Sequence, residues 1–476
     1  MMDELSSESL SLILYFVPPL LRLPLRVVSK RWSACILRLN RLEDLLQLDT
    51  EKEEGIRHLH SNKFMLRLHV LFPNLTRLIA PKTIITMEWL AILQKRLQSL
   101  TIGFLRDFSP LALNFQSFES VTFLSIVLKE EYYSFLSLFP NVRHVIINSS
   151  HPIDSALRFF PATLKTLICS LQNTSSLFRT PFAASLIRLQ VDFNGKDFSL
   201  NEEEMDLHVE LPGLKRVFVE SEHPCVIGLF FKWFTAPNLQ WLGICMTTCK
   251  CTRYQTGDFY SSILSKFPKL ETYMIMCHRS YYLKHGPSLC CDDRYHDNDL
   301  VMTEVHTFVM PNGYLTNKTI ARLSRGIIFP QLEHLYLTDP GNKFHPETVI
   351  RFLESAAAKR MKSIMLNSCI PATQSQSDKI DKIVSDLMSS GSLKVAVIKF
   401  NCRYEMDGNP KLQSNKVCPG QDRSDETWIA IIWYFLIRML YWFRNEHVEK
   451  DEGNQVKEGE NGDESDVTDG EDDKVE

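Results

Sequence analysis

The sequence contains little glycine and none of the short motifs that mark common enzyme classes. Glycine accounts for only 18 of its 476 residues, which favours a repeat solenoid over a nucleotide-binding fold. It also lacks a phosphate-binding P-loop, a Gly-x-Ser-x-Gly nucleophile elbow and a His-Glu-x-x-His zinc motif. We therefore expect a binding protein that is not an enzyme and that needs no cofactor or metal.

Disulfides and secretion are not expected either. The chain has 12 cysteines, and in a chain of this length they favour reduced, buried thiols over a disulfide framework. Five of them fall within or beside expected elements: Cys35, Cys169, Cys245, Cys277 and Cys369. The apolar N-terminal run follows Asp3 and Glu4 rather than basic residues, unlike a secretory signal. The expected location is the cytoplasm, the nucleus or both.

One stretch, 245–296, is dense in side-chain types that bind metals. It contains Cys245, Cys249, Cys251, Cys277, His278, His285, Cys290, Cys291 and His296. Zinc prefers four nitrogen or sulfur ligands, usually from two close pairs, and these spacings suit a single tetrahedral site poorly. We expect instead a long loop inserted between two repeats, which can itself contact a partner.

Residues 3–48 are expected to form a helical unit around a compact apolar block that runs from Leu5 to Ile36. Apolar residues recur at three- and four-residue steps, at Leu10, Ile13, Leu14 and Val17, and predict one face of a helix. Pro18 and Pro19 are expected to end that helix. A second leucine-rich segment and a third helical pattern follow, and 39–48 is expected to continue as a helix. Three short helices bury little core, so such a unit leaves an apolar surface for a partner. Residues 49–63 are expected to be a linker.

Four short motifs stand out in this block: Leu5-Ser6-Ser7-Glu8-Ser9-Leu10, Ile13-Leu14-Tyr15-Phe16-Val17-Pro18, Leu20-Leu21-Arg22-Leu23 and Val27-Val28-Ser29-Lys30-Arg31-Trp32. Together they resemble an F-box. It departs from the family at Ser6, where proline is usual, and at Pro24, in a segment that is usually helical. The resemblance implies docking to a Skp-family adaptor of a cullin ubiquitin ligase core. It implies that the adaptor contacts are Leu5, Leu10, Ile13, Leu14, Phe16, Pro18, Leu20, Leu21, Val28 and Trp32.

A repeated phrase fills residues 64–405. Each copy has the form Leu-x-x-Leu with apolar residues alternating, usually after a proline, as in Phe72-Pro73-Asn74-Leu75-Thr76-Arg77-Leu78. Its first apolar anchors are Leu75, Leu97, Val121, Val142, Leu164, Leu186, Leu214, Leu239, Leu270, Val305, Leu332, Met361 and Leu393. This spacing is typical of leucine-rich repeats, in which neighbours stack to bury a shared core. We expect an α/β fold: a curved parallel sheet with helices on the convex side, and helical inserts at 317–325, 346–359 and 378–388.

The residue before the second leucine of each phrase points away from the core. This column contains Arg, His and aromatic residues, which are common at protein interfaces. The expected target contacts are Arg77, His144, Arg188, Arg216, Trp241 and His334 from this column, and Tyr336 from the next outward column. The arginines suit an acidic or phosphorylated protein segment. The alternative is a solvated sheet face, and no nucleic acid is expected.

The C-terminal end has two parts. Residues 424–445 contain the apolar run Trp428–Phe443, expected to be a helix that caps the last repeat; contact with a membrane is the less favoured alternative. Residues 446–476 contain 14 acidic and 3 basic residues, a net charge of −11. We expect this tail to be disordered. Because the whole chain carries −4, the remainder carries about +7.

These features together predict a substrate-recognition subunit of a Skp–cullin–F-box (SCF) ubiquitin ligase. The F-box would bind the adaptor, and the repeats would bind a protein target for ubiquitination. The alternative is a leucine-rich-repeat scaffold without coupling to a ligase.

Overall fold

The fold comes from a computed structural model of the chain. It describes residues 6–15, 17, 22, 24–47, 68–106, 117–149, 151–173, 175–193, 208–221, 224–246, 266–277, 303–312, 317–326, 329–337, 344–368 and 370–400.

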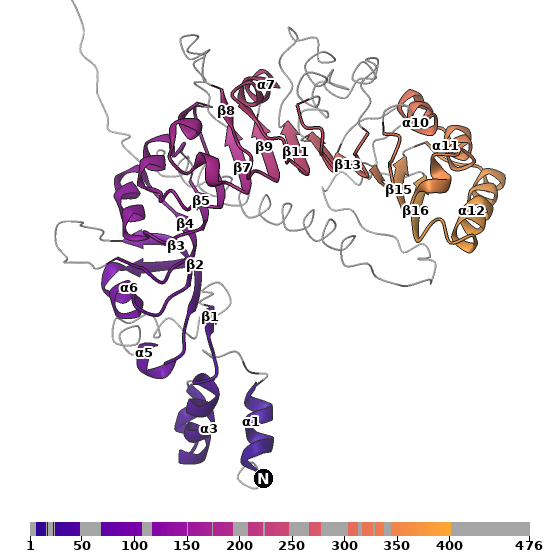
Figure 1. Ribbon diagram of the computed structural model, residues 1–476. Coiled ribbons are helices and arrows are strands. Elements are labelled where there is room, and N and C mark those ends of the chain that lie inside the picture. The colour runs from indigo at the N-terminus through magenta and orange to yellow at the C-terminus, as the bar shows by residue number, and fades with distance from the viewer. Residues whose placement is uncertain are drawn as a thin grey trace, which may run out of the picture. The chain divides into compact units, whose positions relative to one another are not determined.

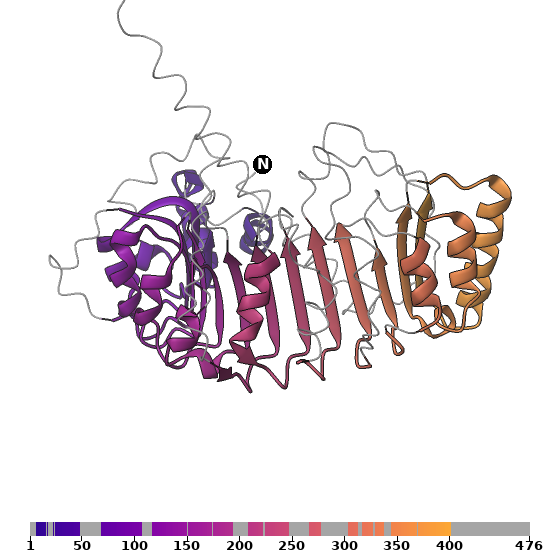
Figure 2. The same cartoon turned by 90° about the horizontal axis from the view of Figure 1, so that it is seen from above.

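The described residues form one parallel sheet of fourteen strands (Figures 1 and 2). In sheet order these are β1 (Leu45–Gln47), β2 (Arg77–Thr86), β3 (Ser99–Arg106), β4 (Phe123–Val127), β5 (His144–Asn148), β6 (Thr166–Ser170), β7 (Arg188–Phe193), β9 (Arg216–Ser221), β11 (Trp241–Met246), β12 (Thr272–Cys277), β13 (Thr307–Asn312), β14 (His334–Leu337), β15 (Ser363–Ser368) and β16 (Val395–Phe400). A separate parallel pair joins β8 (Val209–Glu210) to β10 (Phe234–Thr235). Neighbouring strands in the large sheet follow chain order, as expected when each repeat supplies one strand.

The register confirms the repeat predicted from sequence. From β2 onward, each strand begins at the residue two positions after its apolar anchor, and these first residues pair across the sheet. For example, Arg188 is opposite both Thr166 and Arg216. From β2 to β15 the second and fourth residues of the strands in this sheet, such as Leu189 and Val191, are buried, whereas those of β16, Ala396 and Ile398, are partly buried. The first and third residues lie on the other side, which we call the open face. The fold is therefore an α/β solenoid of the leucine-rich-repeat type.

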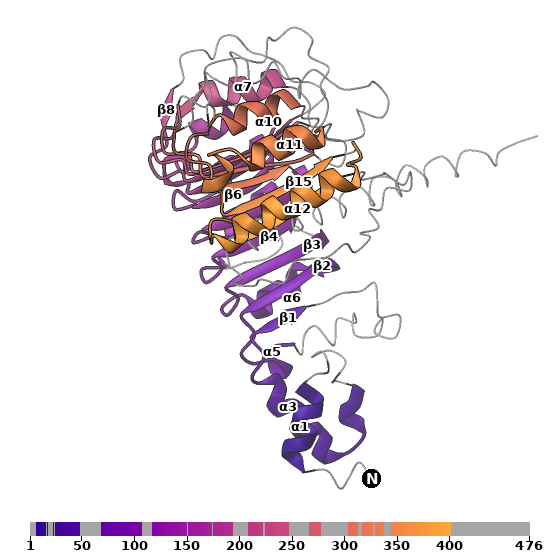
Figure 3. The same ribbon diagram turned by 90° about the vertical axis from the view of Figure 1, so that its right-hand side faces the viewer.

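Helical segments return the chain from one strand to the next on the opposite side of the sheet (Figures 2 and 3). The α-helices among them are α5 (Leu68–Leu71), α6 (Met87–Leu93), α7 (Pro224–Lys232), α10 (Asn317–Ser324), α11 (Pro346–Leu353) and α12 (Gln374–Ser389). Short 3-10 helices serve other repeats: η4 (Glu130–Leu138), η5 (Asp154–Phe159), η6 (Ser176–Arg179), η7 (Ala183–Ser185) and η11 (Ala358–Arg360). The three predicted helical inserts correspond to α10, to α11 with η11, and to α12.

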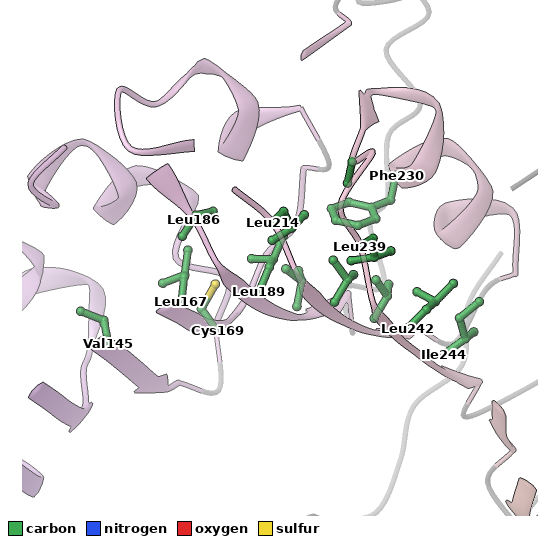
Figure 4. Packing of buried hydrophobic residues seen from close by; sticks show 14 of the residues in the cluster. Val145, Leu167, Cys169, Leu186, Leu189, Leu214, Phe230, Leu239, Leu242 and Ile244 are labelled. Atoms are coloured by element: carbon green, nitrogen blue, oxygen red, sulfur yellow. The ribbon is translucent and has the colours of Figure 1, made fainter. Parts of the chain in front are cut away.

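One continuous apolar core runs between the sheet and these segments (Figure 4). Phe230 of α7 lies near its middle with none of its surface exposed. Its ring centroid is 5.5 Å from those of Phe178 and Phe193 and 5.2 Å from those of Phe231 and Phe234. These rings come from several neighbouring repeats. Their contacts therefore connect the repeats as well as filling each one.

Side-chain amides at the turn before a strand also connect repeats. The Nδ2 atoms of Asn74, Asn141 and Asn238 donate to carbonyls of the preceding repeat at 2.6, 2.9 and 2.9 Å. All three occupy the same place in the phrase Pro-Asn-Leu/Val. The sequence does not have an asparagine ladder after the strand, and the structure shows that these amides instead act just before it.

The N-terminal segment contains α1 (Ser7–Tyr15), the 3-10 helix η2 (Pro24–Val27) and α3 (Lys30–Asn40). Their buried residues form a second, small core of Leu10, Leu14, Trp32, Cys35, Ile36 and Leu39. The Ser29 hydroxyl caps α3 by accepting from the backbone N–H of Trp32 at 3.2 Å. Pro24 is the first residue of η2, so the proline that departs from the F-box pattern does lie in a short helical turn.

The expected helix over 39–48 is wrong. α3 ends at Asn40, and Leu45–Gln47 forms β1, which pairs with β2. The Asp44 carbonyl accepts the backbone N–H groups of Thr76 and Arg77 at 2.9 and 2.8 Å. This pairing satisfies backbone hydrogen-bonding groups of residues about 30 positions further along the chain. It therefore favours a strand here, although the local leucine pattern favours a helix. The sheet thus begins within residues 3–48, and the N-terminal segment continues directly into the first strand.

Several expectations lie outside the described residues. These are the linker 49–63, the helix 424–445, the tail 446–476, and most potential ligands in 245–296. Within the described residues no group of three or more metal-binding side chains occurs. Among the helices described, none combines the length and hydropathy of a membrane span. Cys35, Cys169 and Cys245 are free and buried, as predicted.

Candidate functional site

The N-terminal segment exposes several large apolar side chains. Leu12, Ile13, Tyr15 and Val28 are 63%, 51%, 63% and 55% exposed, and we call them the N-terminal apolar surface. On α1, successive residues are about 100° apart around the helix axis. Leu12 therefore lies opposite the buried Leu10 and Leu14. This separation gives α1 one side that packs in the small core and another side that is exposed.

The predicted adaptor contacts that the structure describes fall into an exposed group and a buried group. Ile13 and Val28 are exposed, whereas Leu10, Leu14 and Trp32 are 1%, 1% and 7% exposed and belong to the small core. Direct contact of a partner with those three would require the segment to open, and their role in adaptor binding stays a prediction. The other five lie outside the described residues: Leu5, Phe16, Pro18, Leu20 and Leu21. Leu12 and Tyr15 were not predicted, because a three- and four-residue pattern identifies the buried side of a helix.

A buried arginine supports this surface. The guanidinium of Arg22 donates to the carbonyls of Val17 and Tyr15 at 2.6 and 3.0 Å and to Glu43 Oε1 at 2.6 Å. Arg22 is only 2% exposed. It therefore satisfies carbonyls at the end of α1 and ties that end to the chain just before β1. The sequence indicates that this arginine is unusual, because Arg22 is the only charged residue between Glu8 and Arg26.

The structure brings the predicted target contacts onto one open face but gives them different surroundings. Arg77 and His144 are exposed, Arg188, Trp241 and His334 are half-buried, and Tyr336 is buried. The Arg77 guanidinium forms an ion pair with Asp44 at 3.0 Å. The His334 ring and the Tyr336 hydroxyl both contact Ser363 Oγ, at 2.6 and 2.8 Å. These residues therefore have polar partners within the protein.

The central strands β7, β9 and β11 carry the remaining predicted contacts. Arg188, Arg216 and Trp241 are consecutive partners in the register. The Trp241 ring stacks on Phe218 with centroids 6.2 Å apart and planes inclined by 27°. We call Arg188, Arg216, Phe218 and Trp241 the central patch. Burial, and then the neighbouring charge of Arg216, lower the pKa of Arg188 to about 10.

His144 is not expected to add a positive charge to the open face at neutral pH. Partial desolvation of the ring against the sheet, and then the charge of Arg143, lower its pKa below the ordinary value of 6.5. The unfolded chain therefore binds this proton more readily, so His144 lowers stability as the pH falls through that range. An NMR titration of the ring should give a midpoint below 6.5, and Arg143→Gln should raise it. An unchanged midpoint in that variant would exclude the contribution from Arg143.

Comparisons with known proteins identify no family for this chain. No protein-family model matches the chain, and no curated protein is significantly similar to it. Among solved structures, a Bacteroides fragilis protein matches at 12% identity with a TM-score of 0.30, covering 50% of this chain and 64% of that one. A chain of the TLR13-ssRNA13 complex matches at 12% identity with a TM-score of 0.36, covering 71% of this chain and 48% of that one. The chain thus spans less than two thirds of either structure.

Proposed function

We propose that this protein is the substrate-recognition subunit of an SCF-type ubiquitin ligase. The N-terminal segment binds a Skp-family adaptor, and through it the cullin core, while the open face of the sheet binds a protein target. The protein itself contributes no catalytic residue. The observation that carries the proposal is the N-terminal apolar surface, which lies on the segment that resembles an F-box.

The distribution of exposed apolar side chains supports a partner at this end. Eight large hydrophobic side chains are exposed among the described residues, and five of them lie between Leu12 and Leu42. Single exposed hydrophobic residues are ordinary, but a concentration on one small segment is typical of an interaction surface. The small core below it contains only six buried residues, so the segment gains further stability when a partner covers its outer side.

The direct link to the sheet supports coupling between the two surfaces. The N-terminal segment runs into β1 without an intervening linker, and Asn74 and Arg77 of the first full repeat bond to Arg41 and Asp44. An adaptor bound to the segment would thus be connected to the sheet by hydrogen-bonded backbone. A receptor needs this kind of connection to present a target in a defined position.

Adaptor capture by paired variants tests the proposal. Ile13→Asp combined with Val28→Asp should reduce capture of a purified Skp-family adaptor by tenfold or more, because both replace exposed apolar contacts with charges. Val70→Asp is the matched control, since Val70 is 65% exposed but lies in α5 outside the segment. Circular dichroism should be unchanged in all variants. Leu10 is unsuitable for this test because its loss would disturb the core.

Two results would contradict the proposal. The first is a wild-type protein that captures no adaptor under conditions in which a known F-box protein does. The second is equal loss of capture in the Val70 control. Either result would favour the scaffold without ligase coupling, in which the N-terminal segment only covers the first repeat.

A further inference from the structure

We propose that a row of basic residues, at the edge of the sheet where β5, β6, β7 and β9 begin, binds an acidic protein segment with an apolar residue at its centre. The cations are Arg143, Lys165, Lys215 and Arg216, which we call the basic row, and Ile187 lies among them. The site follows from these residues alone. Its use in choosing a ligase target rests on the proposed function.

The backbone holds these residues side by side. Arg143, Lys165, Ile187 and Lys215 each come directly before a strand, and the strands begin along one edge of the sheet (Figure 2). The backbone N–H of Lys165 donates to the carbonyl of Arg143 at 2.8 Å, that of Ile187 to Lys165 at 2.8 Å, and that of Lys215 to Ile187 at 2.9 Å. Because neighbouring strands are about 4.8 Å apart, the four positions extend over about 14 Å.

The cations of the basic row have no anionic partner in the part of the chain that the structure describes. Arg143, Lys215 and Arg216 are exposed, and Lys165 is half-buried. None of the four side chains forms an ion pair or a hydrogen bond with a described residue. Arg143 and Lys165 are neighbours across two strands, and like charges at such positions are destabilising. Carboxylates bound to the row would remove this repulsion and accept charge-assisted hydrogen bonds.

The positive charge is confined to this part of the edge. At the same position before β3 and β4 the chain has the uncharged Gln98 and Thr122. Before β11 and β12 it has Gln240 and Glu271, and Gln240 Nε2 donates to Glu271 Oε1 at 3.2 Å. An acidic ligand is therefore attracted to the strands from β5 to β9 and is repelled at β12. A short segment of a partner fits such a bounded site.

The exposed side chain of Ile187 favours a protein segment as the ligand. Among the described residues from 71 to 394, Ile187 is the only large hydrophobic side chain that is exposed, at 41%. In an extended segment, side chains two residues apart lie on one side and are about 7 Å from each other. The sequence acid-x-apolar-x-acid would place its apolar residue at Ile187 and its acids near the cations on either side. A nucleic-acid phosphate backbone has no apolar group for that position.

Fluorescence anisotropy with three labelled 11-residue peptides tests this inference on the full chain. The five central residues are Glu-x-Leu-x-Glu, Gln-x-Leu-x-Gln or Glu-x-Ser-x-Glu. The first peptide should bind about tenfold more tightly than the second, because charge-assisted hydrogen bonds are stronger than neutral ones. It should bind about threefold more tightly than the third, because leucine covers Ile187 and serine does not. Its affinity should also fall as salt rises.

Variants then identify the site. Lys165→Gln with Lys215→Gln should weaken binding of the Glu-x-Leu-x-Glu peptide about tenfold. Lys359→Gln with Lys382→Gln is the matched control, because it removes the same charge from exposed lysines of η11 and α12. Ile187→Ala should weaken the leucine peptide about threefold and leave the serine peptide unchanged. Adaptor capture should be normal in all these variants, so a failure of the proposed function would appear separately.

Four outcomes would overturn the inference. One is equal binding, or no binding, of the acidic and neutral peptides. Another is an equal loss of affinity in the two pairs of lysine variants, which would indicate general charge attraction. The third is binding of single-stranded RNA or of phosphatidylserine vesicles, lost in Lys165→Gln with Lys215→Gln, without binding of any peptide. The fourth is binding of the acidic peptide only after residues 446–476 are removed, which would assign the row to the chain's own acidic residues.

Discussion

Replacing Phe230 with alanine is expected to lower the free energy of unfolding by about 3–5 kcal/mol. The phenyl ring is fully buried and contacts four other aromatic rings, two from its own repeat and two, Phe178 and Phe193, from preceding elements of the solenoid. Its removal deletes both the buried apolar surface and the edge-to-face contacts, and a solenoid cannot collapse easily around the cavity because each strand is fixed by its neighbours. Urea denaturation followed by circular dichroism measures the loss.

Because a solenoid can unfold in parts, hydrogen exchange should accompany that measurement. The loss of protection should centre on β7, β9 and β11, since repeats contact mainly their neighbours. Ile187→Ala is the matched control. Ile187 is 41% exposed, so its truncation should change stability by less than about 1 kcal/mol. Equal effects in the two variants would mean that the ring cluster does not hold these repeats together.

The repeats could be predicted from sequence because their information is local. Each strand has alternating apolar residues and a proline or turn just before its anchor, and stacking then fixes the register. Residues such as Arg188, Arg216 and Trp241 could therefore be placed side by side although 53 positions separate the first from the last. A column of outward residues needs only the correct strand starts.

The features that could not be predicted depend on contacts between residues far apart in the sequence, which a local pattern does not indicate. β1 has only three residues, too few for a periodicity, and its partner β2 is about 30 positions away. The stacking of Trp241 on Phe218 depends on the absence of a side chain at Gly243, where a Cβ atom would lie 2.5 Å from Phe218 Cδ2 and 2.7 Å from Trp241 Cη2. A regular apolar pattern in sequence identifies one face of a helix. In a segment this small much of that face is the core, as Leu10 and Leu14 show, and the sequence does not indicate which apolar side chains stay exposed.

Arg22 connects these two sides of the N-terminal segment. It donates to two backbone carbonyls near the end of α1 and forms an ion pair with Glu43, whose side chain is 24% exposed. Lysine cannot replace it, because one ammonium group cannot reach acceptors that a planar guanidinium reaches in three directions. Removing the guanidinium leaves the carbonyls of Tyr15 and Val17 without this donor and Glu43 without its cation. Each such loss destabilises the folded segment, because these groups are partly buried and water cannot fully replace the lost partner.

Arg22→Met is therefore expected to destabilise the N-terminal segment by about 3–5 kcal/mol. The repeats should keep their structure, since they are stabilised by their own neighbours. Limited proteolysis should then cleave within residues 6–47 while the sheet remains protected, and adaptor capture should fall together with the protection. Arg38→Met is the matched control, because Arg38 is an exposed arginine of α3. If the two variants resist protease equally, Arg22 does not organise the segment. If Arg22→Met unfolds the segment but captures the adaptor normally, the adaptor does not bind the ordered N-terminal apolar surface, and the proposed function loses its main support.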